Sequence, residues 1–499
     1  MPPYFLAHTR SMSSMPHLPL WNGFSYFEHQ TIGIDWMLDK ERNGTEVPAR
    51  DKKGTVVVRG GFQCDDMGLG KTIQMVATMA NNRVRSTLLL APLAMIATWV
   101  DICKKAGMIV YEADRSSWYR TNVSDPFPMH FMKCRPVVYI TNYEKIYHNM
   151  VLFKRPWDRI VLDEAHKIRN GDGTLAYRLR KMVAPIRWAI TGTPLVNSKK
   201  DVVSLMGFIG VPVSLLWTWE KHFDGLLPHI LLHRSLDSLR SSIKGAPPVP
   251  VIKSDILPFK TPQEEEFYHG VQGATESMIA KYSSDLLDNQ SFLLLLRLRQ
   301  ISVHPQVYIN AKRREDRTYS RRDWSLPSTK MERIKEIIEA DQKEGDQKED
   351  ESAHKYIVFC QFHDEMKLIH DFLVTEELID EDHVLSYHGG MNQGERKKVL
   401  DYSKKTTKPT VLLLQLQAGG VGLNLQEYDR IIFVSPWWTA ALMDQAIARA
   451  VRIGQTKVVQ IYHLRLDAEA DSTINIDDLV SQKAEQKRKM LEALFELCE

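Results

Sequence analysis

One stretch decides the fold of this chain, and it reads Cys64-Asp65-Asp66-Met67-Gly68-Leu69-Gly70-Lys71-Thr72. Its glycines let backbone N–H groups approach phosphate oxygens, Lys71 offers an ammonium group to the β and γ phosphates, and Thr72 can hold Mg²⁺. The general pattern G-x-x-x-x-G-K-[ST] has glycine where this chain has Asp65, so the match is imperfect. The stretch predicts a phosphate-binding loop that opens a helix, and a glycine turn with a surface lysine is the alternative interpretation.

Short apolar runs bounded by turn residues recur on both sides of this loop. They lie at residues 55–58, 87–92, 136–141, 159–164 and 187–191. Such runs are typical of buried parallel strands. Helix-capable stretches separate them, including 72–80 directly after the loop and 174–183 before the last run. The alternation predicts a doubly wound α/β lobe.

The pattern changes between residues 200 and 350, where long helical segments such as 262–287 and 291–301 replace the apolar runs. We therefore expect an inserted or bridging helical region. The near-duplicate DQKEGDQKED at 341–350 predicts a solvated loop. A basic cluster precedes it and consists of Lys312, Arg313, Arg314, Arg317, Arg321 and Arg322.

A second alternating series predicts a second α/β lobe. Its apolar runs lie at residues 355–362, 383–390, 410–417, 430–436 and 458–464. The tail carries Leu479, Met490, Leu491, Leu494 and Phe495 in helical rhythm and is expected to pack on a lobe. The predicted domains are an extension at 1–20, a first lobe at 21–215, a helical insertion at 216–325, a second lobe at 326–475 and a C-terminal helix at 476–499.

The composition favours an ordinary globular enzyme, with 43% hydrophobic and 25% charged residues in 499. The net charge of +3 is too small to indicate a nucleic-acid partner by itself. The five cysteines lack the spacing of a zinc site, so no zinc is expected. The N-terminus does not resemble a signal peptide, and the apolar span 88–100 is interrupted by Pro92 and too short for a bilayer. We expect a soluble, intracellular protein without a membrane partner.

Two adjacent carboxylates, Asp163 and Glu164, follow the apolar run that begins at Arg159. Because the carboxyl ends of strands in an open α/β sheet face the ligand crevice, Asp163 can reach Mg²⁺ while Glu164 polarises the attacking water. A polar strand end with an incidental ion pair is the alternative interpretation of these two residues alone. Together with the phosphate loop, they predict hydrolysis of a nucleoside triphosphate.

A succession of six strings resembles the SWI/SNF-type (sucrose-nonfermenting family) helicase-like ATPases of helicase superfamily 2. The resemblance covers roughly residues 20–490 and implies two RecA-like lobes that close on ATP. The strings are DDMGLGKT at 65–72, DEAH at 163–166, TGTP at 191–194, FCQF at 359–362, QAGGVGLNL at 417–425 and QAIARAVRIGQ at 445–455. The last string is much more specific than a phosphate loop.

The resemblance assigns roles to individual residues. Gln30 matches the adenine-recognising glutamine of the family, and a helix-surface amide is the alternative interpretation. Arg449 and Arg452 match arginines that reach the phosphates across the lobe interface, a task that suits a guanidinium because it stays charged and binds phosphate bidentately. The implied catalytic residues are Lys71, Asp163, Glu164, Arg449 and Arg452, with Thr72 and Asp163 for Mg²⁺ and Gln30, Asp66, Met67, Gly68, Leu69, Gly70, Lys71, Thr72 and Gly422 for ATP.

Other segments match parts of the family that act on nucleic acid. TGTP at 191–194 is implied to couple hydrolysis to lobe movement, and 91–99 and 141–144 resemble segments that contact the nucleic-acid backbone. Residues 231–235 and 298–307 resemble the helical insertions of the family. Gly419, Gly420 and Gly422 fit a turn near phosphate, whereas Trp437 and Trp438 are expected to pack in the interior.

Five positions depart from the family pattern, and none of them removes a catalytic residue. Asp66 replaces Glu, Val196 replaces Gln, Thr439-Ala440 replaces Asn-Pro and Val451 replaces His. We therefore expect retained ATP hydrolysis with altered coupling to DNA. No paired cysteines lie between residues 200 and 350, so the RING finger of many repair members is not predicted.

The resemblance implies an ATP-dependent translocase on double-stranded DNA that remodels or displaces protein–DNA complexes, in chromatin remodelling, DNA repair or transcription. Its expected cofactors are ATP and Mg²⁺, and its partners are duplex DNA that carries bound protein and targeting proteins. A nuclear location is expected if the source is eukaryotic. A strand-separating helicase on DNA or RNA is one alternative, and a diverged ATP-binding scaffold without translocation is another.

Overall fold

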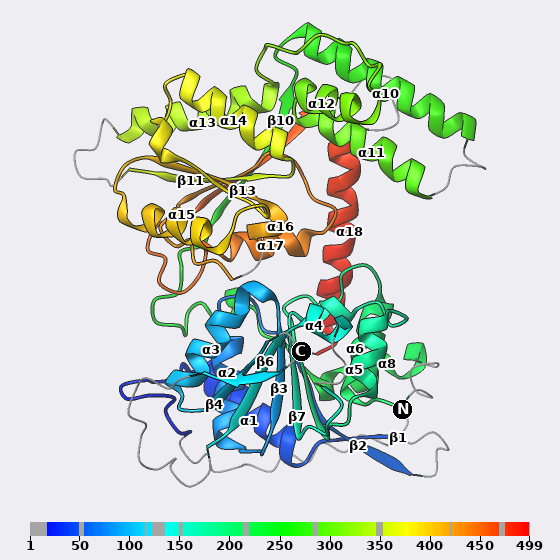
Figure 1. Ribbon diagram of the computed structural model, residues 1–499, viewed down its shortest axis with the longest axis vertical. Coiled ribbons are helices and arrows are strands. Elements are labelled where there is room, and N and C mark those ends of the chain that lie inside the picture. Colours follow the sequence, from blue (N-terminus) through cyan, green and yellow to red (C-terminus); the bar gives the residue numbers. More distant parts are fainter. Residues whose placement is uncertain are drawn as a thin grey trace. The chain divides into compact units, whose positions relative to one another are not determined.

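The computed structural model describes residues 17–48, 54–114, 117–121, 135–148, 153–212, 219–282, 288–345, 353–419, 422–468 and 475–498. The chain divides into two compact units (Figure 1), the first comprising Met1–Ala246 and Lys487–Glu499 and the second Pro247–Gln486. The division at Ala246 falls inside the predicted insertion at 216–325, and the predicted helix at 476–499 contributes to both units.

A mostly parallel sheet forms the centre of the first unit. Among the described residues it has nine strands in the order β1-β2-β8-β7-β3-β6-β4-β5, and β9 pairs with β2. The strands from β2 to β4 in this order run parallel, whereas β1 and β5 pair antiparallel at the two ends. The bounds are β1 (Thr45–Pro48), β2 (Thr55–Gln63), β3 (Thr87–Ala91), β4 (Ile109–Ala113), β5 (Trp118–Arg120), β6 (Val137–Asn142), β7 (Arg159–Asp163), β8 (Ile186–Ile190) and β9 (Leu231–Leu232). The predicted runs correspond to β2, β3, β6, β7 and β8, so the α/β lobe is confirmed.

Helices cover both faces of this sheet (Figure 1), and alternate strand residues pack against each layer. Val161 of β7 packs with α1, α2 and α3, whereas Ile160 and Leu162 pack with α4, α5, α6 and α8. The helices are α1 (Glu28–Arg42), α2 (Lys71–Asn81), η1 (Leu93–Met95), α3 (Ile96–Lys105), α4 (Tyr143–His148), η4 (Ala165–Ile168), α5 (Thr174–Lys181), α6 (Lys199–Ile209), α8 (Trp219–Ile230) and α9 (Leu236–Leu239).

The second unit contains a sheet that is parallel throughout its described part, in the order β10-β15-β14-β11-β13-β12. The predicted runs correspond to β11 (Lys355–Cys360), β12 (Val384–Tyr387), β13 (Thr410–Gln415), β14 (Arg430–Phe433) and β15 (Gln460–Asp467). The edge strand β10 (Val251–Pro258) was missed, because most of its side chains are exposed and no apolar run marks it. The two parallel-sheet units confirm the predicted pair of RecA-like lobes.

Helices also cover the sheet of the second unit. They are α10 (Pro262–Tyr282), α11 (Asp288–Val303), α12 (Pro305–Glu315), α13 (Thr329–Gly345), α14 (His363–Thr375), η5 (Glu381–His383), α15 (Gln393–Lys405), α16 (Leu416–Gly419), α17 (Ala440–Ile447) and α18 (Ile476–Glu496). The predicted loop at 341–350 is wrong for residues 341–345, which complete α13. Asp341 is buried there and pairs with Arg430 at 2.9 Å, which ties this turn to β14. Residues 346–350 lie outside the described residues.

The C-terminal helix α18 packs at both ends, as its periodicity predicted. Near its start, Asp477 forms a buried ion pair with Lys330 at 2.7 Å. Near its end, Leu494 and Phe495 join the hydrophobic core of the first unit. Met490 does not follow the prediction, because its side chain is 38% exposed.

The structure also bears on the expectations about membrane spans, cysteines and the N-terminal extension. In the part that the structure describes, no helix has the length and apolar character needed to span a bilayer. Among the described residues, Cys64, Cys103, Cys360 and Cys498 take no part in a disulfide. Cys134 and most of the predicted N-terminal extension, residues 1–16, lie outside the described residues.

Candidate nucleotide-binding site

The predicted phosphate loop joins a central parallel strand to a helix N-terminus. β2 ends at Gln63 and α2 begins at Lys71. Gly68 and Gly70 have φ values of 90° and 79°, in the left-handed region that glycine adopts without strain. Leu69 between them is fully buried and anchors the turn in the protein. This strand–loop–helix geometry suits the binding of phosphate at the start of α2.

Asp65, which departs from the general phosphate-loop pattern, holds the loop in place. Its buried carboxylate accepts hydrogen bonds from Gln63 and Gln74, each at 3.0 Å. It also pairs bidentately with Arg234, whose Nε lies 2.9 Å from Asp65 Oδ1. The residue at this position is therefore a structural anchor rather than a defect in the loop.

Arg234 was missed by the sequence prediction, which assigned residues 231–235 to a helical insertion. That assignment is wrong for Leu231 and Leu232, which form β9 and pair with β2. This short strand continues the sheet beside the phosphate loop and so delivers Arg234 to Asp65. A two-residue strand leaves no periodic signal in the sequence.

Gln30, the predicted adenine-binding residue, lies beside the loop on α1. Its side chain is only 6% exposed, which excludes the alternative of a surface amide. Gln30 Nε2 lies 3.4 Å from the carbonyl oxygen of Leu69, and His29 and Gln74 contact the same carbonyl at 3.0 and 3.3 Å. A Cβ atom on Gly70 would lie 2.5 Å from Gln30 Nε2, so this approach requires glycine. Its role toward adenine stays a prediction.

The ammonium group of Lys71 lies inside the loop. Its Nζ donates to the backbone carbonyls of Asp65 and Asp66 at 2.6 and 3.1 Å. A Cβ atom added to Gly192 would lie 3.7 Å from this Nζ, which places the TGTP segment at the same site. Thr72 and Met67 are half-buried neighbours of Lys71 in the same loop and helix start.

Asp163 ends β7 next to this lysine. Burial raises the pKa of its carboxyl group to about 7, and the negative charge of Glu164 adds to the shift. The hydrogen bond from Trp99 and the charge of Lys71 act in the opposite direction. A buried carboxylate beside a second carboxylate is poorly stabilised by the protein alone, which is the condition in which a cation binds well.

Glu164 has a strained backbone. Its φ and ψ are both 51°, in the left-handed region that non-glycine residues rarely adopt. Its carboxylate lies 3.4 Å from His166 Nδ1, and the same nitrogen lies 3.3 Å from the hydroxyl of Thr191. The DEAH and TGTP strings therefore meet at the carboxyl edge of the sheet, the edge at which the sequence predicted Asp163 and Glu164.

Segments 91–99 and 141–144, which resemble segments that contact nucleic acid, each contribute one side chain that hydrogen-bonds to Asp163. Trp99 of α3 is fully buried and donates from Nε1 to Asp163 Oδ2 at 2.7 Å. Tyr143 of α4 is 2% exposed and donates its hydroxyl to the backbone carbonyl of Asp163 at 2.6 Å. The resemblance implied nucleic-acid contact for the two segments, and the structure gives one side chain of each a direct contact with the candidate metal ligand.

The departure at Val196 has a structural explanation. The backbone N–H groups of Val196, Asn197 and Ser198 point to Asp201 Oδ2, at 3.0, 2.6 and 3.3 Å. Asp201 thus orders the turn after TGTP through the main chain. The identity of the side chain at position 196 is not needed for this arrangement.

The remaining predicted residues lie in the second unit. Gly422 has a φ of 77°, as expected for a glycine turn, and Gly420 lies outside the described residues. Arg449 and Arg452 follow α17, and burial lowers the pKa of Arg452. Val451 between them is 5% exposed and packs in the core, which accounts for an apolar residue at this position.

Trp437 and Trp438 are half-buried rather than packed in the interior as predicted, and both lie beside one cation. The guanidinium carbon of Arg299 lies 4.9 Å and 5.7 Å from their ring centroids. Arg299 is 7% exposed, and burial lowers its pKa to about 10. A buried guanidinium between aromatic rings explains why both tryptophans stand at this position.

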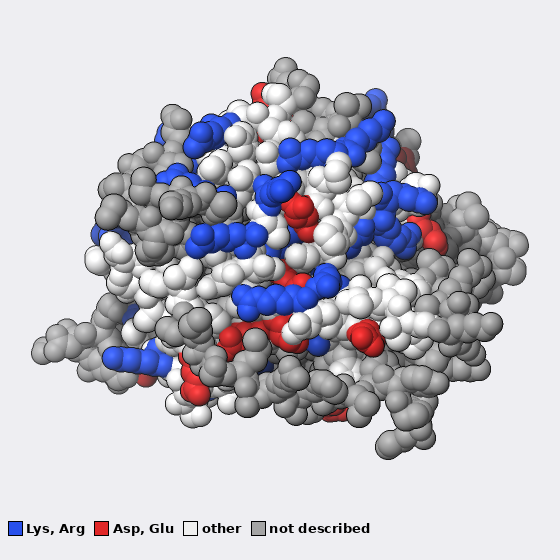
Figure 2. Space-filling view, turned by 90° about the horizontal axis from the view of Figure 1, so that it is seen from below, with Lys and Arg blue, Asp and Glu red and all other residues white. Residues whose placement is uncertain are grey.

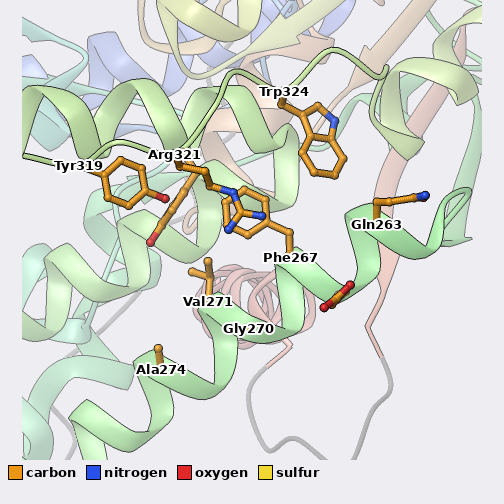
Figure 3. A pocket seen from close by; sticks show the side chains of 10 residues that line it. Gln263, Phe267, Gly270, Val271, Ala274, Tyr319, Arg321 and Trp324 are labelled. Carbon is orange, nitrogen blue, oxygen red and sulfur yellow. The ribbon is translucent and has the colours of Figure 1, made fainter.

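One residue of the basic cluster noted in the sequence, Arg321, lines a separate cavity of about 600 Å³ between α10 and the segment that follows α12. Figure 3 shows Arg321 in this cavity, and its guanidinium lies 3.5 Å from the centroid of Phe267. Arg313 and Arg314 pair with Asp323 and Asp364. Much of the cluster therefore serves contacts within the chain.

Surface charge does not single out a nucleic-acid site on the face shown in Figure 2. Lys and Arg side chains are spread over the described part of this face, and Asp and Glu side chains lie between some of them. This mixture agrees with the small net charge of +3. Any assignment of a nucleic-acid surface must rest on specific residues.

Comparison with known proteins gives two family matches and several relatives. The SNF2-related domain matches residues 29–307, and the helicase conserved C-terminal domain matches residues 329–454. The chain is 26% identical over 479 residues to a probable global transactivator of Orgyia pseudotsugata multicapsid polyhedrosis virus, covering 90% of this chain and 88% of the relative.

Two other relatives are longer than this chain. One is the CHD3-type chromatin-remodeling factor CHR7 of Arabidopsis thaliana, which is 26% identical over 429 residues and covers 80% of this chain and 33% of the relative. The other is the putative ATP-dependent helicase/translocase YwqA of Bacillus subtilis, which is 24% identical over 503 residues. This match covers 94% of this chain and 50% of the relative. The SNF2-related domain alone matches more than half of the residues of this chain. The chain therefore belongs to the SNF2 family of helicase-like ATPases in superfamily 2.

Proposed function

We propose that this ATPase is a translocase on double-stranded DNA that remodels or displaces protein–DNA complexes. The observation that carries the proposal is the convergence of Trp99 and Tyr143 on Asp163. Each comes from a segment that resembles a nucleic-acid-contacting segment of the family, and each bonds the residue proposed to bind the metal ion. Contact with a DNA backbone can therefore alter the ATP site through two hydrogen bonds.

The proposed roles follow from the chemistry of the site. Lys71 binds the β and γ phosphates, and Glu164 orients the attacking water. Thr72 and Asp163 offer a hydroxyl and a carboxylate, the hard oxygen ligands that suit Mg²⁺, which would neutralise charge on the phosphates. Gln30 is proposed to contact adenine, and Gly422, Arg449 and Arg452 are proposed to contact the nucleotide or its phosphates.

The names of the relatives support the choice of substrate. One is called a chromatin-remodeling factor and one a helicase/translocase. Backbone contacts would make movement independent of base sequence, as a remodelling motor requires. Action in chromatin remodelling, DNA repair or transcription, targeting by partner proteins, and a nuclear location in a eukaryotic source belong to the same proposal, and imaging of the tagged chain tests the location.

The test measures ATP hydrolysis with duplex DNA, single-stranded DNA and RNA, together with ATP-dependent displacement of the third strand of a DNA triplex. We expect duplex DNA to stimulate hydrolysis most and the third strand to be released. Lys71→Ala and Glu164→Gln are each expected to lower DNA-stimulated turnover at least 100-fold without lowering the melting temperature. Lys105→Ala is the matched control, because its side chain is 56% exposed and pairs only with Asp101 in the described structure.

Three outcomes would contradict the proposal. Stimulation by RNA above duplex DNA would favour a strand-separating helicase. Nucleotide binding without DNA-stimulated turnover would favour a scaffold. Undiminished turnover of Glu164→Gln would remove Glu164 from the catalytic set.

A further inference from the structure

The segment that follows α8 braces the first half of the phosphate loop. The N–H of Cys64 donates to the carbonyl of Leu232 at 2.7 Å, and the N–H of Asp66 donates to the carbonyl of Arg234 at 3.0 Å. In return, Asp66 Oδ2 accepts the N–H of Leu236 at 2.8 Å. Because two main-chain hydrogen bonds and one from a backbone N–H to the Asp66 carboxylate join the two stretches, a shift of the bracing segment would move the phosphate loop with it.

His233 lies in the middle of this segment and faces the loop. Its Nε2 lies 3.6 Å from Asp66 Oδ1, and its side chain is 9% exposed. Burial alone would raise the pKa of Asp66, but the contacts with His233 and with the N–H of Leu236 hold it below its ordinary value. Asp66 is therefore held as a carboxylate in one orientation, five residues before Lys71.

One face of the His233 ring is covered by the C-terminal helix. Phe495 stacks face to face on the imidazole, with ring centroids 3.5 Å apart and an interplanar angle of 3°. Phe495 is 8% exposed and Leu494 beside it is 2% exposed, and both belong to the core that includes Cys64. The imidazole is thus held between the phosphate loop and the last turn of α18.

Two further contacts, from Lys487 within α18 and from Cys498 just beyond it, lie at the same location. Lys487 Nζ donates to Asn197 Oδ1 at 3.0 Å, in the turn after TGTP. Burial raises the pKa of the Cys64 thiol well above its ordinary value, and Cys498 lies close enough to add to that shift. The end of α18 therefore lies next to both the phosphate loop and the TGTP turn.

We propose that Phe495 is a positioning residue of the ATP site, which acts by holding His233 against Asp66 and so fixes the geometry of the phosphate loop. The C-terminal helix would thereby be a working part of the ATPase rather than a cover for its core. This goes beyond the proposed action on DNA, because it concerns ATP binding in the first unit alone. Asp66 is also one of the departures from the family pattern, and the proposal gives this shorter carboxylate a specific partner.

The test compares Phe495→Leu with Phe495→Tyr in the full chain. Leucine keeps the apolar burial but removes the ring, whereas tyrosine keeps the ring. We expect Phe495→Leu to raise KM for ATP roughly 3- to 10-fold, the range that corresponds to loss of one aromatic stack, with a smaller change in kcat. Phe495→Tyr is expected to remain within about twofold of the wild type.

Met490→Ala is the matched control, because it removes a large apolar side chain from the same part of the helix at a site that is 38% exposed. Its KM for ATP and its melting temperature are expected to match those of the wild type. Basal hydrolysis and binding of a fluorescent ATP analogue are measured without DNA, so that a failure of translocation does not affect the result.

A double-mutant comparison with Asp66→Asn tests the route of the effect. If Phe495 acts through His233 and Asp66, Phe495→Leu adds little to KM in the Asp66→Asn background. Full additivity of the two changes in KM would overturn the proposal. So would a Phe495→Leu protein that loses thermal stability but keeps the KM and kcat of the wild type, because the ring would then serve packing alone.

Discussion

Both ends of strand β7 carry a buried charged residue, but its charged neighbour has the opposite sign at the amino end and the same sign at the carboxyl end. At the amino end, Arg159 is fully buried and donates from Nε to Glu41 Oε1 at 2.7 Å. Glu41 also accepts hydrogen bonds from Trp188 and Asn82 at 2.8 and 2.6 Å. At the carboxyl end, Asp163 is buried beside a charge of the same sign.

The difference indicates which end is structural and which is functional. Opposite charges with several hydrogen bonds form a closed network that needs no ligand. Burial and then the like charge of Glu164 raise the pKa of Asp163 at the carboxyl end, and the left-handed backbone of Glu164 adds strain at the next residue. Protein groups offset these costs only in part, so a cation and a phosphate group would stabilise this end on binding.

The largest effect is expected from breaking the network at the amino end. Arg159→Met leaves Glu41 as a buried carboxylate without its cation, which is expected to lower the free energy of unfolding by about 3–5 kcal/mol. Denaturant titration of the full chain, followed by circular dichroism, measures this change. Any fall in ATPase activity is expected to track the fraction unfolded.

A double variant shows how much of the stability loss comes from the unpaired Glu41 charge and how much from changed packing. Arg159→Met combined with Glu41→Leu removes both charges and is expected to cost less than the sum of the two single changes. If Arg159→Met instead kept its stability but lost ATP hydrolysis, the amino end would be functional and the contrast between the two ends would be wrong.

A smaller, pH-dependent effect is expected at the carboxyl end in the ligand-free protein. Because the pKa of Asp163 is raised from 3.8 to about 7, the folded state binds a proton that the unfolded state releases between these values. The stabilisation by this proton is complete below pH 4 and is lost as the pH rises through about 7. The Asp163→Asn side chain does not ionise, so this variant does not lose stability through that group as the pH rises.

The measurement is the difference in unfolding free energy between the wild type and Asp163→Asn from pH 4.5 to 8, in the presence of a chelator. We expect this difference to move by about 2–4 kcal/mol in favour of the variant and to level off above pH 7. Asp237→Asn is the control, since that side chain is 86% exposed and is expected to follow the wild type at every pH. A difference that does not change with pH would mean that Asp163 stays ionised in the folded protein.

The contrast also explains what the sequence could and could not predict. The parallel strands β3, β7, β11 and β13 are buried on both faces, so they appear as continuous apolar runs. Lys71 was found from the phosphate-loop pattern, and Asp163 and Glu164 were found because they stand at the carboxyl end of the run that forms β7. Local patterns of this kind are visible without knowledge of the fold.

Partners that are distant in the chain were not predictable. Glu41 meets Arg159 across 118 positions, and Asp65 meets Arg234 across 169. Phe495 reaches His233 only because α18 returns to the first unit. None of these pairs has a spacing rule, since each depends on the order of strands in the sheet or on the path of the last helix.

The smallest expected effect concerns the hydrogen bond that supports the carboxyl end. Trp99→Phe keeps the buried ring in the first turn of α3 but removes the N–H that lies 2.7 Å from Asp163 Oδ2. Residues that orient a metal ligand typically contribute tenfold or more to metal affinity, so the Mg²⁺ concentration for half-maximal ATP hydrolysis is expected to rise about 10-fold. Trp157→Phe is the matched control, because its indole is equally buried and donates to the carbonyl of Phe153 instead. Equal Mg²⁺ dependence of the two variants would show that Asp163 is oriented by its strand alone, whereas a shift confined to Trp99→Phe would tie a segment resembling a DNA contact to the metal site.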